Sequence, residues 1–554
     1  MENIVLLCIV LFIILAAFLY GLYQKKQYRK TVIKKIKDSY GMSPSREYSD
    51  GEYAHIGGYN RNHKSDFSLD DITWNDLNMD AVFSAVNYSY TSAGEEYLYY
   101  LLRNPSLKGE SNEELEKNVA YYADHEEERN NILLALHDCG RTGKYSIYDY
   151  LNNLSILDDE NAVRDVAVDC LYLIAAACFF FNIGVGIAAA FAVLFVSLST
   201  YFKKKKHIEP YITCFSYVFR ILGSAETIAG SKAGDAFTEE RKKLSELKKR
   251  FTKFRSFSWL LYESGGGDPL GIVVDYLRMF FHLDIIKFFH MRNEIKRHWD
   301  DIDEILTIIG KIDSTMSVLL LRAHITDHCS PVFKGDSYKA SDIYHILLSE
   351  PVKNDVDFDK GLILTGSNAS GKSTLLKTVA VNAVLAQSIN TVMASSYEAP
   401  AYRIYTSLAL QDNIFEGESY YMTEIKSLKR IMDSSKDRST PILACVDEVL
   451  RGTNTVERIS ASSVILRSLA DVRGLILAAT HDFELAYMLE DIYDNYHFEE
   501  KIEEDDIFFP YKILKGPATT RNAITLLKLV GYDSEIVEKA QAAAKKYEET
   551  GSFY

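Results

Sequence analysis

The chain has 554 residues, of which 47% are hydrophobic and 25% are charged. This balance is typical of a globular protein with several domains, and it excludes a mostly disordered chain or a small disulfide scaffold. The formal charge is 62 minus 77, or −15, so nucleic acid could be bound only through a local basic patch. The seven cysteines form no C-x-x-C pair, which predicts reduced thiols and no zinc site.

The first predicted element is a transmembrane anchor over residues 1–24. No charged residue occurs from Asn3 to Gln24, and at about 1.5 Å per residue such a helix crosses the roughly 30 Å hydrocarbon layer. Glu2 precedes the run and four basic residues follow it: Lys25, Lys26, Arg29 and Lys30. This charge bias predicts an uncleaved anchor whose N-terminus lies outside and whose other end lies in the cytoplasm. A buried core helix is the alternative.

A transmembrane hairpin is predicted over residues 166–202. The uncharged run that ends at Phe202 begins at Cys170, and it is too long for one untilted span and slightly short for two. Residues suited to a tight turn in its middle are Asn182, Gly184 and Gly186. Two arms keep the basic residues on both sides of the run in the cytoplasm, whereas one span would export everything that follows. A re-entrant or buried helix pair is the alternative.

An all-α domain in two halves is predicted on either side of the hairpin, after a juxtamembrane linker over residues 25–70. The first half covers residues 71–165. The second half covers residues 203–335, where apolar and charged positions alternate at helical spacing. Within it, Arg241–Arg255 is rich in basic residues on a predicted helix. This stretch could track DNA phosphates without reading sequence, form a solvated helix face, or contact anionic lipid.

Residues 336–554 are predicted to form an α/β P-loop ATPase domain with a doubly wound sheet. A buried strand over residues 361–365 enters a G-x-x-x-x-G-K-[ST] loop that opens a helix. The loop residues are Gly366, Ser367, Asn368, Ala369, Ser370, Gly371, Lys372, Ser373 and Thr374. In such a loop the backbone N–H groups and the helix N-terminus bind the phosphates of ATP. Lys372 would reach the β- and γ-phosphates, and the Ser373 hydroxyl would ligate Mg²⁺.

Two further apolar strands end at residues suited to catalysis. The strand over residues 442–446 leads to Asp447, which suits the Mg²⁺ shell, and to Glu448, which suits a general base for the attacking water. The strand over residues 474–479 leads to His481, at the end where doubly wound folds place ligands. His481 would sense the γ-phosphate or the water. We therefore predict an ATP hydrolase with these catalytic residues: Lys372, Glu448 and His481.

Together these residues resemble the ATPase domain of the DNA mismatch repair MutS family over about residues 340–545. Five segments follow the motifs of that family in order: Thr365–Thr374, Ala399–Tyr405, Gly417–Glu424, Asp447–Thr455 and Ala479–Leu485. The resemblance implies a homodimer in which the loop bearing Ser419 completes the nucleotide site of the opposite subunit. A simple helix cap is the alternative role for Ser419.

A weaker resemblance lies upstream, where Thr73–Asp80 and Ser92–Pro105 are similar to the start of the lever domain of that family. The chain ahead of Thr73 leaves no room for a mismatch-reading domain. The Phe498–Glu500 run is interpreted as an acidic surface. We therefore expect a membrane-anchored member of the family that lacks the mismatch-recognition domain, with no nuclease-like extension after Lys545.

The leading hypothesis is a membrane-tethered MutS-like ATPase that works as a homodimer on the cytoplasmic face of the cell membrane. It would bind ATP and Mg²⁺, and couple dimer closure and lever movement to a contact with double-stranded DNA, as in mismatch repair. One alternative is a nucleotide-gated membrane scaffold that does not bind DNA. Another is the ATPase of a membrane transporter, although such a protein would carry an L-S-G-G-Q-like signature where this chain reads Gly417-Glu-Ser-Tyr-Tyr.

Overall fold

A computed structural model describes residues 2–44, 46, 48–143, 145–157, 160–232, 234–251, 269–367, 370–408, 420–451, 453–503, 506–518, 524, 527 and 531–550. The chain divides into two compact units. The helical unit comprises Met1–Lys64, Val86–Tyr100 and Glu113–Ile325, and the sheet unit comprises Ser65–Ala85, Leu101–Asn112 and Thr326–Tyr554. The first half of the predicted all-α domain, residues 71–165, is therefore shared between the two units.

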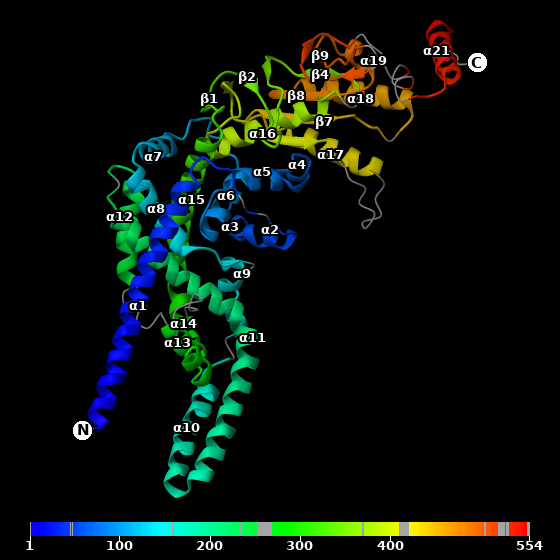
Figure 1. The fold of residues 1–554 in the computed structure, drawn as a ribbon. Helices are drawn as coiled ribbons and strands as arrows, with labels where there is room; N and C mark the ends of the chain where they lie inside the picture. The colour runs from blue at the N-terminus through cyan, green and yellow to red at the C-terminus, as the bar shows by residue number, and fades with distance from the viewer. Residues whose placement is uncertain are drawn as a thin grey trace. The chain divides into compact units, whose positions relative to one another are not determined.

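Most of the helical unit is α-helix (Figure 1). Its helices are α1 (Glu2–Asp38), α2 (Asp50–Ile56), α3 (Gly58–Asn62), α6 (Ser92–Arg103, which ends in the sheet unit), α7 (Glu113–Asp124), α8 (Glu126–Cys139), α9 (Ile147–Leu151), η1 (Leu154–Leu157), α10 (Val163–Phe181), α11 (Ile183–Ala229), α12 (Thr238–Leu247), η2 (Lys248–Phe251), α13 (Pro269–Phe280), α14 (Leu283–Arg297) and α15 (Trp299–His324). The predicted helical pattern of residues 208–335 is thus largely confirmed among the residues described there. Helix α15 forms the core because its apolar residues recur every three or four positions, as at Ile302, Ile305, Ile309 and Ile312.

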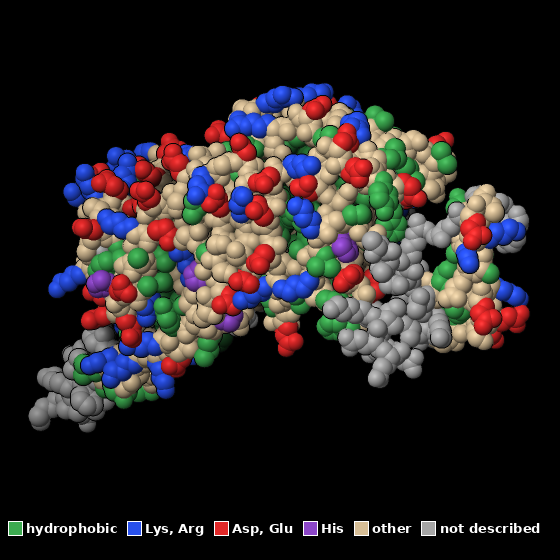
Figure 2. All heavy atoms as spheres, turned by 90° about the horizontal axis from the view of Figure 1, so that it is seen from above, with side chains coloured by type: hydrophobic (Ala, Val, Ile, Leu, Met, Phe, Trp, Pro, Cys, Tyr) green, Lys and Arg blue, Asp and Glu red, His purple; other side chains and the backbone are tan. Residues whose placement is uncertain are grey.

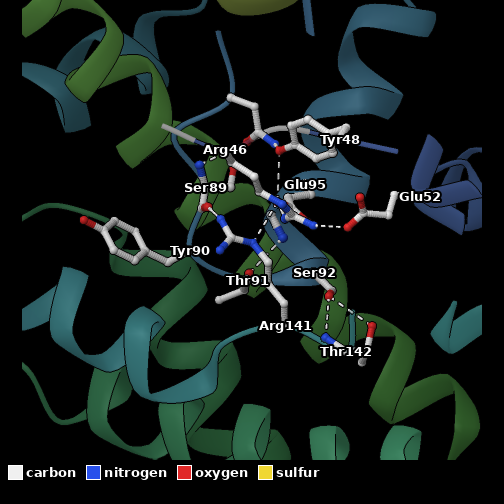
Figure 3. A network of polar contacts seen from close by, with 12 residues as sticks. Arg46, Tyr48, Glu52, Ser89, Tyr90, Thr91, Ser92, Glu95, Arg141 and Thr142 are labelled. Carbon is white, nitrogen blue, oxygen red and sulfur yellow. Dashed lines mark hydrogen bonds and ion pairs between the residues drawn. The ribbon is translucent and has the colours of Figure 1, made fainter. Parts of the chain in front are cut away.

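A network of hydrogen bonds and ion pairs attaches the segment between α1 and α2 to helix α6 (Figure 3). Glu95 of α6 is buried, and its carboxylate accepts hydrogen bonds from Arg46, from Nε of Arg141 at 2.7 Å and from the Tyr48 hydroxyl at 3.2 Å. Arg46 also donates to Glu52 at 2.9 Å. Within the predicted linker over residues 25–70, the described chain is mostly helical, and Arg46 and Tyr48 are bonded to α6. The polar composition of residues 25–70 predicted a linker, because the ion-pair partners of this segment lie far away in the sequence.

Helices α10 and α11 lie side by side as an antiparallel hairpin (Figure 1). The chain turns at Asn182 alone, and Gly184 and Gly186 lie in the first turn of α11. Asn182 caps α11, because its Oδ1 accepts hydrogen bonds from the backbone N–H groups of Gly184 at 2.8 Å and Val185 at 3.2 Å. Among the residues that the structure describes, one helix, α11, is long and apolar enough to cross a membrane, by length and composition only.

Among its described residues, the sheet unit combines a six-stranded, mostly parallel sheet with a four-stranded sheet, a two-stranded sheet and covering helices (Figure 1). Its strands are β1 (Val332–Phe333), β2 (Tyr338–Ile343), β3 (Asn354–Phe358), β4 (Leu362–Thr365), β5 (Ser396–Ala399), β6 (Arg403–Ser407), β7 (Ile442–Asp447), β8 (Gly474–Ala479), β9 (Asp494–His497), β10 (Lys501–Glu503), β11 (Asp506–Phe508) and β12 (Leu514–Lys515). Its helices are α4 (Asp71–Asp76), α5 (Met79–Val86, whose last residue lies in the helical unit), α16 (Lys372–Ile389), α17 (Tyr420–Ser434), α18 (Thr455–Ala470), α19 (Phe483–Met488) and α21 (Ser534–Thr550).

The larger sheet has the strand order β12-β9-β4-β8-β7-β6, and its strands are parallel except for β12. The three predicted strands, β4, β7 and β8, are confirmed and are neighbours. Leu364 and Asp447 both lie opposite Ala479 of the central β8. Since the carboxyl ends of parallel strands share one edge, this register brings the residues that follow each strand together.

Helix α4 joins the sheet unit through the end strand β6. The carboxylate of Asp76 accepts hydrogen bonds from the Thr406 hydroxyl and from the Leu408 backbone, both at 2.8 Å. Arg430 of α17 pairs with Asp70, which caps α4. These contacts explain why residues 65–85 pack with the sheet, although the sequence analysis assigned residues 65–70 to the linker and residues 71–85 to the helical domain.

Candidate active site

The candidate site lies where β4, β7 and β8 end and α16 begins. Gly366, directly after β4, has a φ of +140°, and a Cβ atom there would lie 2.8 Å from the Phe498 carbonyl oxygen. A side chain at this position would therefore be strained and would clash. The Ser370 hydroxyl closes the loop by donating to the Ser367 carbonyl at 2.7 Å. Lys372, Ser373 and Thr374 form the first turn of α16.

Lys372 folds back over its own loop. Its Nζ donates to the carbonyl oxygens of Gly366 at 2.7 Å and Ser367 at 2.8 Å, and lies 3.4 Å from Nε2 of His481. The side chain is only 3% exposed, and this burial lowers the pKa of the amine to about 8, although nearby Asp447 and Glu448 favour its charged form. The ammonium group therefore lies in a low-dielectric position where an anionic ligand would stabilise its charge.

Two carboxylates at the end of β7 have different partners. The Ser373 hydroxyl donates to Asp447, whose pKa is raised by burial. Glu448 pairs with Nε2 of His481 at 2.8 Å and with Nε of Arg451 at 2.9 Å. The hydrogen bond from His481 lowers the pKa of Glu448, so Glu448 stays ionised and able to accept a proton. The structure thus brings together the predicted residues Lys372, Ser373, Asp447, Glu448 and His481.

The backbone holds Glu448 in an uncommon conformation. Its φ is +53°, in the left-handed region, and its N–H donates to the Ala479 carbonyl at 2.9 Å. Such a conformation in a non-glycine residue costs free energy and is enriched at functional sites. Next to β8, Asp482 accepts two hydrogen bonds from Arg458, at 2.6 and 2.9 Å, which fixes the turn that carries His481.

The oxygens of Ser373 and Asp447 fit a magnesium ion. Mg²⁺ prefers oxygen ligands, and it is usually bound by one or two protein groups together with substrate phosphates and water. The hydroxyl of Ser373 already contacts the carboxylate of Asp447, so one cation could contact both groups. Within the described part of the chain, no group of three or more His, Cys, Asp or Glu residues is suited to hold a metal by itself. A cation held by Ser373 and Asp447 would take its other ligands from water or from a bound substrate.

A cavity of about 420 Å³ opens beside the loop. It is lined by the start of α16, from Gly371 to Thr374, and by side chains from distant segments, among them Tyr344, His345, Leu348 and Tyr511. His345 is buried, and burial lowers its pKa to about 4, so its imidazole is uncharged at neutral pH. A pocket of this size with apolar and aromatic walls suits a small-molecule ligand.

Other positions differ from the sequence-based interpretation or lie beyond it. Asn368, Ala369 and Ser419 lie outside the described residues, so their predicted roles stay predictions. The run interpreted as an acidic surface, residues 498–500, is only partly exposed: Phe498 is buried, and the half-buried Glu500 accepts a hydrogen bond from Ser367 at 3.2 Å. Sequence reasoning also missed the cavity residues His345 and Tyr511, which no local motif distinguishes.

Comparisons with known proteins agree with this geometry. Residues 362–548 match the protein family described as MutS domain V. This match supports a relationship between the sheet unit and the MutS family. The DNA mismatch repair protein MutS of one Thermus thermophilus strain is 33% identical over 193 residues, which are 34% of this chain and 23% of that protein. MutS of Thermus aquaticus is 29% identical over 260 residues, or 46% of this chain and 31% of that protein.

A third relative extends the same pattern. MutS of Lactobacillus delbrueckii subsp. bulgaricus is 28% identical over 279 residues, or 48% of this chain and 32% of that protein. The chain thus spans about a quarter to a third of the length of the curated MutS proteins it matches. The matched family segment contains the candidate site from β4 to His481, so the similarity covers the site itself.

Proposed function

We propose that the sheet unit is a MutS-type ATPase that binds ATP at the loop over residues 366–374. The observation that carries this proposal is the meeting of Lys372, the Ser373–Asp447 pair and the Glu448–His481 pair at one edge of one sheet. The match to MutS domain V supports it. The adjacent cavity of about 420 Å³ would take the nucleoside part of ATP, with its phosphates toward Lys372.

Each residue of the site has a separate task in this proposal. The backbone of the loop and the Lys372 ammonium bind phosphate oxygens. Ser373 and Asp447 would hold Mg²⁺, which supplies neutralisation of phosphate charge when it is bound. Glu448 accepts a proton from the attacking water, and His481 orients Glu448 before the nucleotide arrives. Phosphate charge then competes with Glu448 for His481 and Lys372, which frees the carboxylate for the water.

The test of this assignment is the Glu448→Gln variant of the full chain in detergent. Glutamine keeps the size of the side chain but cannot accept the proton, so ATP turnover should fall about 10²–10⁴-fold. Binding of a fluorescent ATP analogue should persist, since Glu448 does not hold the phosphates. Unchanged steady-state hydrolysis would reject Glu448 as the base. The exposed Glu535 in α21, which pairs with Lys539, offers a matched Glu→Gln control that should keep full turnover.

The larger assembly is a further part of the proposal. The chain would act as a homodimer in which the loop bearing Ser419 completes the partner's nucleotide site, as the resemblance to MutS implies. It would be tethered to the cell membrane by residues 1–24 and by the hairpin of α10 and α11, with the sheet unit in the cytoplasm. The length and composition of α11 support the tether. Flotation of the full chain with lipid vesicles tests it.

DNA binding depends on the basic stretch at α12 and η2. Within it Lys243 pairs with Glu304 at 3.0 Å, and Arg250 pairs with Asp301, so acidic partners neutralise part of the charge. On the face seen in Figure 2, Lys and Arg side chains also lie among Asp and Glu side chains. We propose duplex DNA as the partner on the strength of the MutS relatives, with a DNA-independent membrane scaffold as the competing function.

Duplex binding by the solubilised protein separates these two functions. Salt-sensitive binding that is lost when Lys248, Lys249 and Arg250 are changed to Gln would support DNA as the partner. Neutralising Lys296 and Arg297, two exposed basic residues of α14, is the matched control and should matter less. No binding at low salt, with or without ATP, would favour the scaffold.

A further inference from the structure

A layer of polar contacts, here called the hairpin root, fixes the level at which α10 and α11 leave the rest of the helical unit. His282, between α13 and α14, is fully buried. Its Nδ1 lies 2.7 Å from Asp169 of α10, and its Nε2 lies 3.0 Å from the Thr200 hydroxyl of α11. The Ser197 hydroxyl donates to the Phe280 carbonyl at 2.7 Å. These contacts therefore define the positions along α10 and α11 at which the two helices are attached to the rest of the helical unit.

Beyond the hairpin root, both arms expose apolar side chains. Among those with most of their surface uncovered are Leu173, Phe180, Phe181, Ile183, Phe191 and Phe195. Phe180 and Phe181 at the tip are 93% and 91% exposed. Apolar surface that is this extensive indicates contact with another apolar phase. In Figure 1 the N-terminal end of α1 points to the same side of the helical unit as the hairpin tip.

The free arms are too short to cross a bilayer. From the hairpin root, residues 170–181 form the first free arm, with 12 residues (181 minus 169), and residues 183–196 form the second, with 14 (196 minus 182). At about 1.5 Å per residue these arms reach about 18 to 21 Å, whereas the hydrocarbon layer is about 30 Å thick. An arm that starts at one surface therefore passes the middle of the layer and ends before the opposite surface.

The turn of the hairpin is also built for an apolar environment. It consists of one residue, Asn182, between apolar neighbours. Its N–H donates to the Cys178 carbonyl at 3.0 Å, and its carbonyl accepts from the Gly186 N–H at 2.9 Å. Its side-chain oxygen satisfies the N–H groups of Gly184 and Val185. These main-chain groups therefore need no water, which is the condition for backbone inside hydrocarbon.

The residues next to the hairpin root suit the membrane surface. Tyr201 and Phe202 are followed directly by four lysines, of which Lys203 and Lys206 are exposed. A hollow of about 520 Å³ at this level is lined by Lys206, Phe202 and Arg278, among others. Aromatic and basic side chains favour the lipid headgroup region, and lysines favour anionic headgroups.

We propose that the α10–α11 hairpin enters the bilayer from the cytoplasmic side and does not cross it, with its tip near the middle of the hydrocarbon layer and its root among the headgroups. This inference rests on the proposed membrane tether and decides between the spanning and re-entrant alternatives. The protein would thus be attached to the membrane by an apolar hairpin inserted from one side, in addition to the anchor over residues 1–24.

Tryptophan depth measurement in the full chain tests this proposal. Phe181→Trp places a reporter at the tip, and Phe202→Trp places one at the hairpin root, where the native side chain is 58% exposed. Vesicles would contain zwitterionic and anionic lipid, with bromine either near the headgroup or deep in the acyl chain. The emission of the unsubstituted protein, which has three tryptophans, is subtracted. We expect deep bromine to quench the tip reporter more strongly and shallow bromine to quench the root reporter more strongly.

Each other outcome overturns the proposal in a distinguishable way. Strong quenching of the tip reporter by shallow bromine would place the tip at one of the two membrane surfaces and not near the middle of the hydrocarbon layer. No quenching of either reporter, in protein that floats with the vesicles, would show that only the anchor holds the membrane. Failure to float would reject the tether itself, whereas ATP turnover of the same samples reports on the site independently.

Discussion

Acidic side chains in the two units have contrasting partners. Asp313 of α15 is fully buried, and its carboxylate accepts hydrogen bonds from the backbone N–H groups of Tyr90 and Thr91 and from the Thr91 hydroxyl. Asp447 in the sheet unit is half-buried, and the exposed Ser373 hydroxyl donates to it. Main-chain donors at a helix start cannot turn toward another ligand, whereas an exposed hydroxyl can. Asp313 is therefore structural, and Asp447 is available for chemistry.

The two ion-paired glutamates show the same contrast. Glu95 forms ion pairs with Arg46 and Arg141 in the network of Figure 3 and is 3% exposed. Glu448 is also paired twice, but its partner Arg451 is 63% exposed and the other partner is the imidazole of His481. The number of bonds is thus a poor guide to function. The two sites differ in whether the ion-pair partners of the glutamate can release its carboxylate and bind a ligand instead.

Among the tests of this contrast between the two units, the largest effect is expected at Asp447. Asp447→Asn removes the negative charge that would hold Mg²⁺, so ATP turnover should fall about 10²–10³-fold, the size found when one group that stabilises transition-state charge is removed. Chelation of Mg²⁺ in the unsubstituted protein should abolish turnover. Thermal unfolding should change little, because the carboxylate is half-buried and not bound by main-chain donors. Normal turnover of the variant at the same Mg²⁺ concentration would remove the distinction between Asp447 and Asp313.

The next effect is on stability and involves Gly94, at the start of α6. A Cβ atom there would overlap Oδ2 of Asp313, so Gly94→Ala must displace the carboxylate from its main-chain donors. We expect a loss of about 2–3 kcal/mol in the free energy of unfolding, measured by denaturant titration in detergent. Gly223→Ala in α11 is the matched control, because, apart from its chain neighbours and the nearby backbone of its own helix, no atom lies within 4 Å of its added Cβ. Equal stability of the two variants would contradict a structural role for Asp313.

The sequence predicted the sheet site well because the necessary signals are local. Each strand is a short apolar run, and its motif follows directly, so register alone brings Lys372, Asp447 and His481 to one edge. It could not predict that α4 packs on β6, since the bond from Thr406 to Asp76 joins residues 330 positions apart. For the same reason, the polar segment over residues 25–70 was predicted to be a linker: its bonding partners are distant in the sequence.

The cavity beside the loop shows the same limit. His345 and Tyr511 come from segments far apart in the chain, and no spacing rule connects them with the glycine-rich loop. The hairpin shows an intermediate case. Its uncharged run was evident from composition, but its reach depends on where the root begins, and the contacts of His282 with Asp169 and Thr200 determine that level.

A smaller, graded effect is expected from the pH. Burial lowers the pKa of Lys372 to about 8 in the unliganded site, where Asp447, Glu448 and Glu500 favour the charged amine. Bound phosphate stabilises the ammonium and raises this pKa, so binding takes up a proton above pH 8. ATP-analogue affinity should be constant up to about pH 8 and then fall roughly tenfold for each pH unit. Lys372→Met should bind weakly without this slope, and a flat profile of the unsubstituted protein to about pH 9.5 would contradict the assignment.

The smallest effect is expected at Asp491, an exposed carboxylate of the sheet unit. It accepts two hydrogen bonds from Arg467, at 2.8 and 3.2 Å, and these lower its pKa. Both side chains are more than half exposed, so water and salt screen the pair. Asp491→Asn should change neither ATP turnover nor the unfolding midpoint, at low or high salt. Asp491 accepts two hydrogen bonds from a side chain, whereas Asp447 accepts one. A clear loss of turnover or stability in Asp491→Asn would therefore contradict the view that exposure, and not the number of hydrogen bonds, decides what a carboxylate contributes.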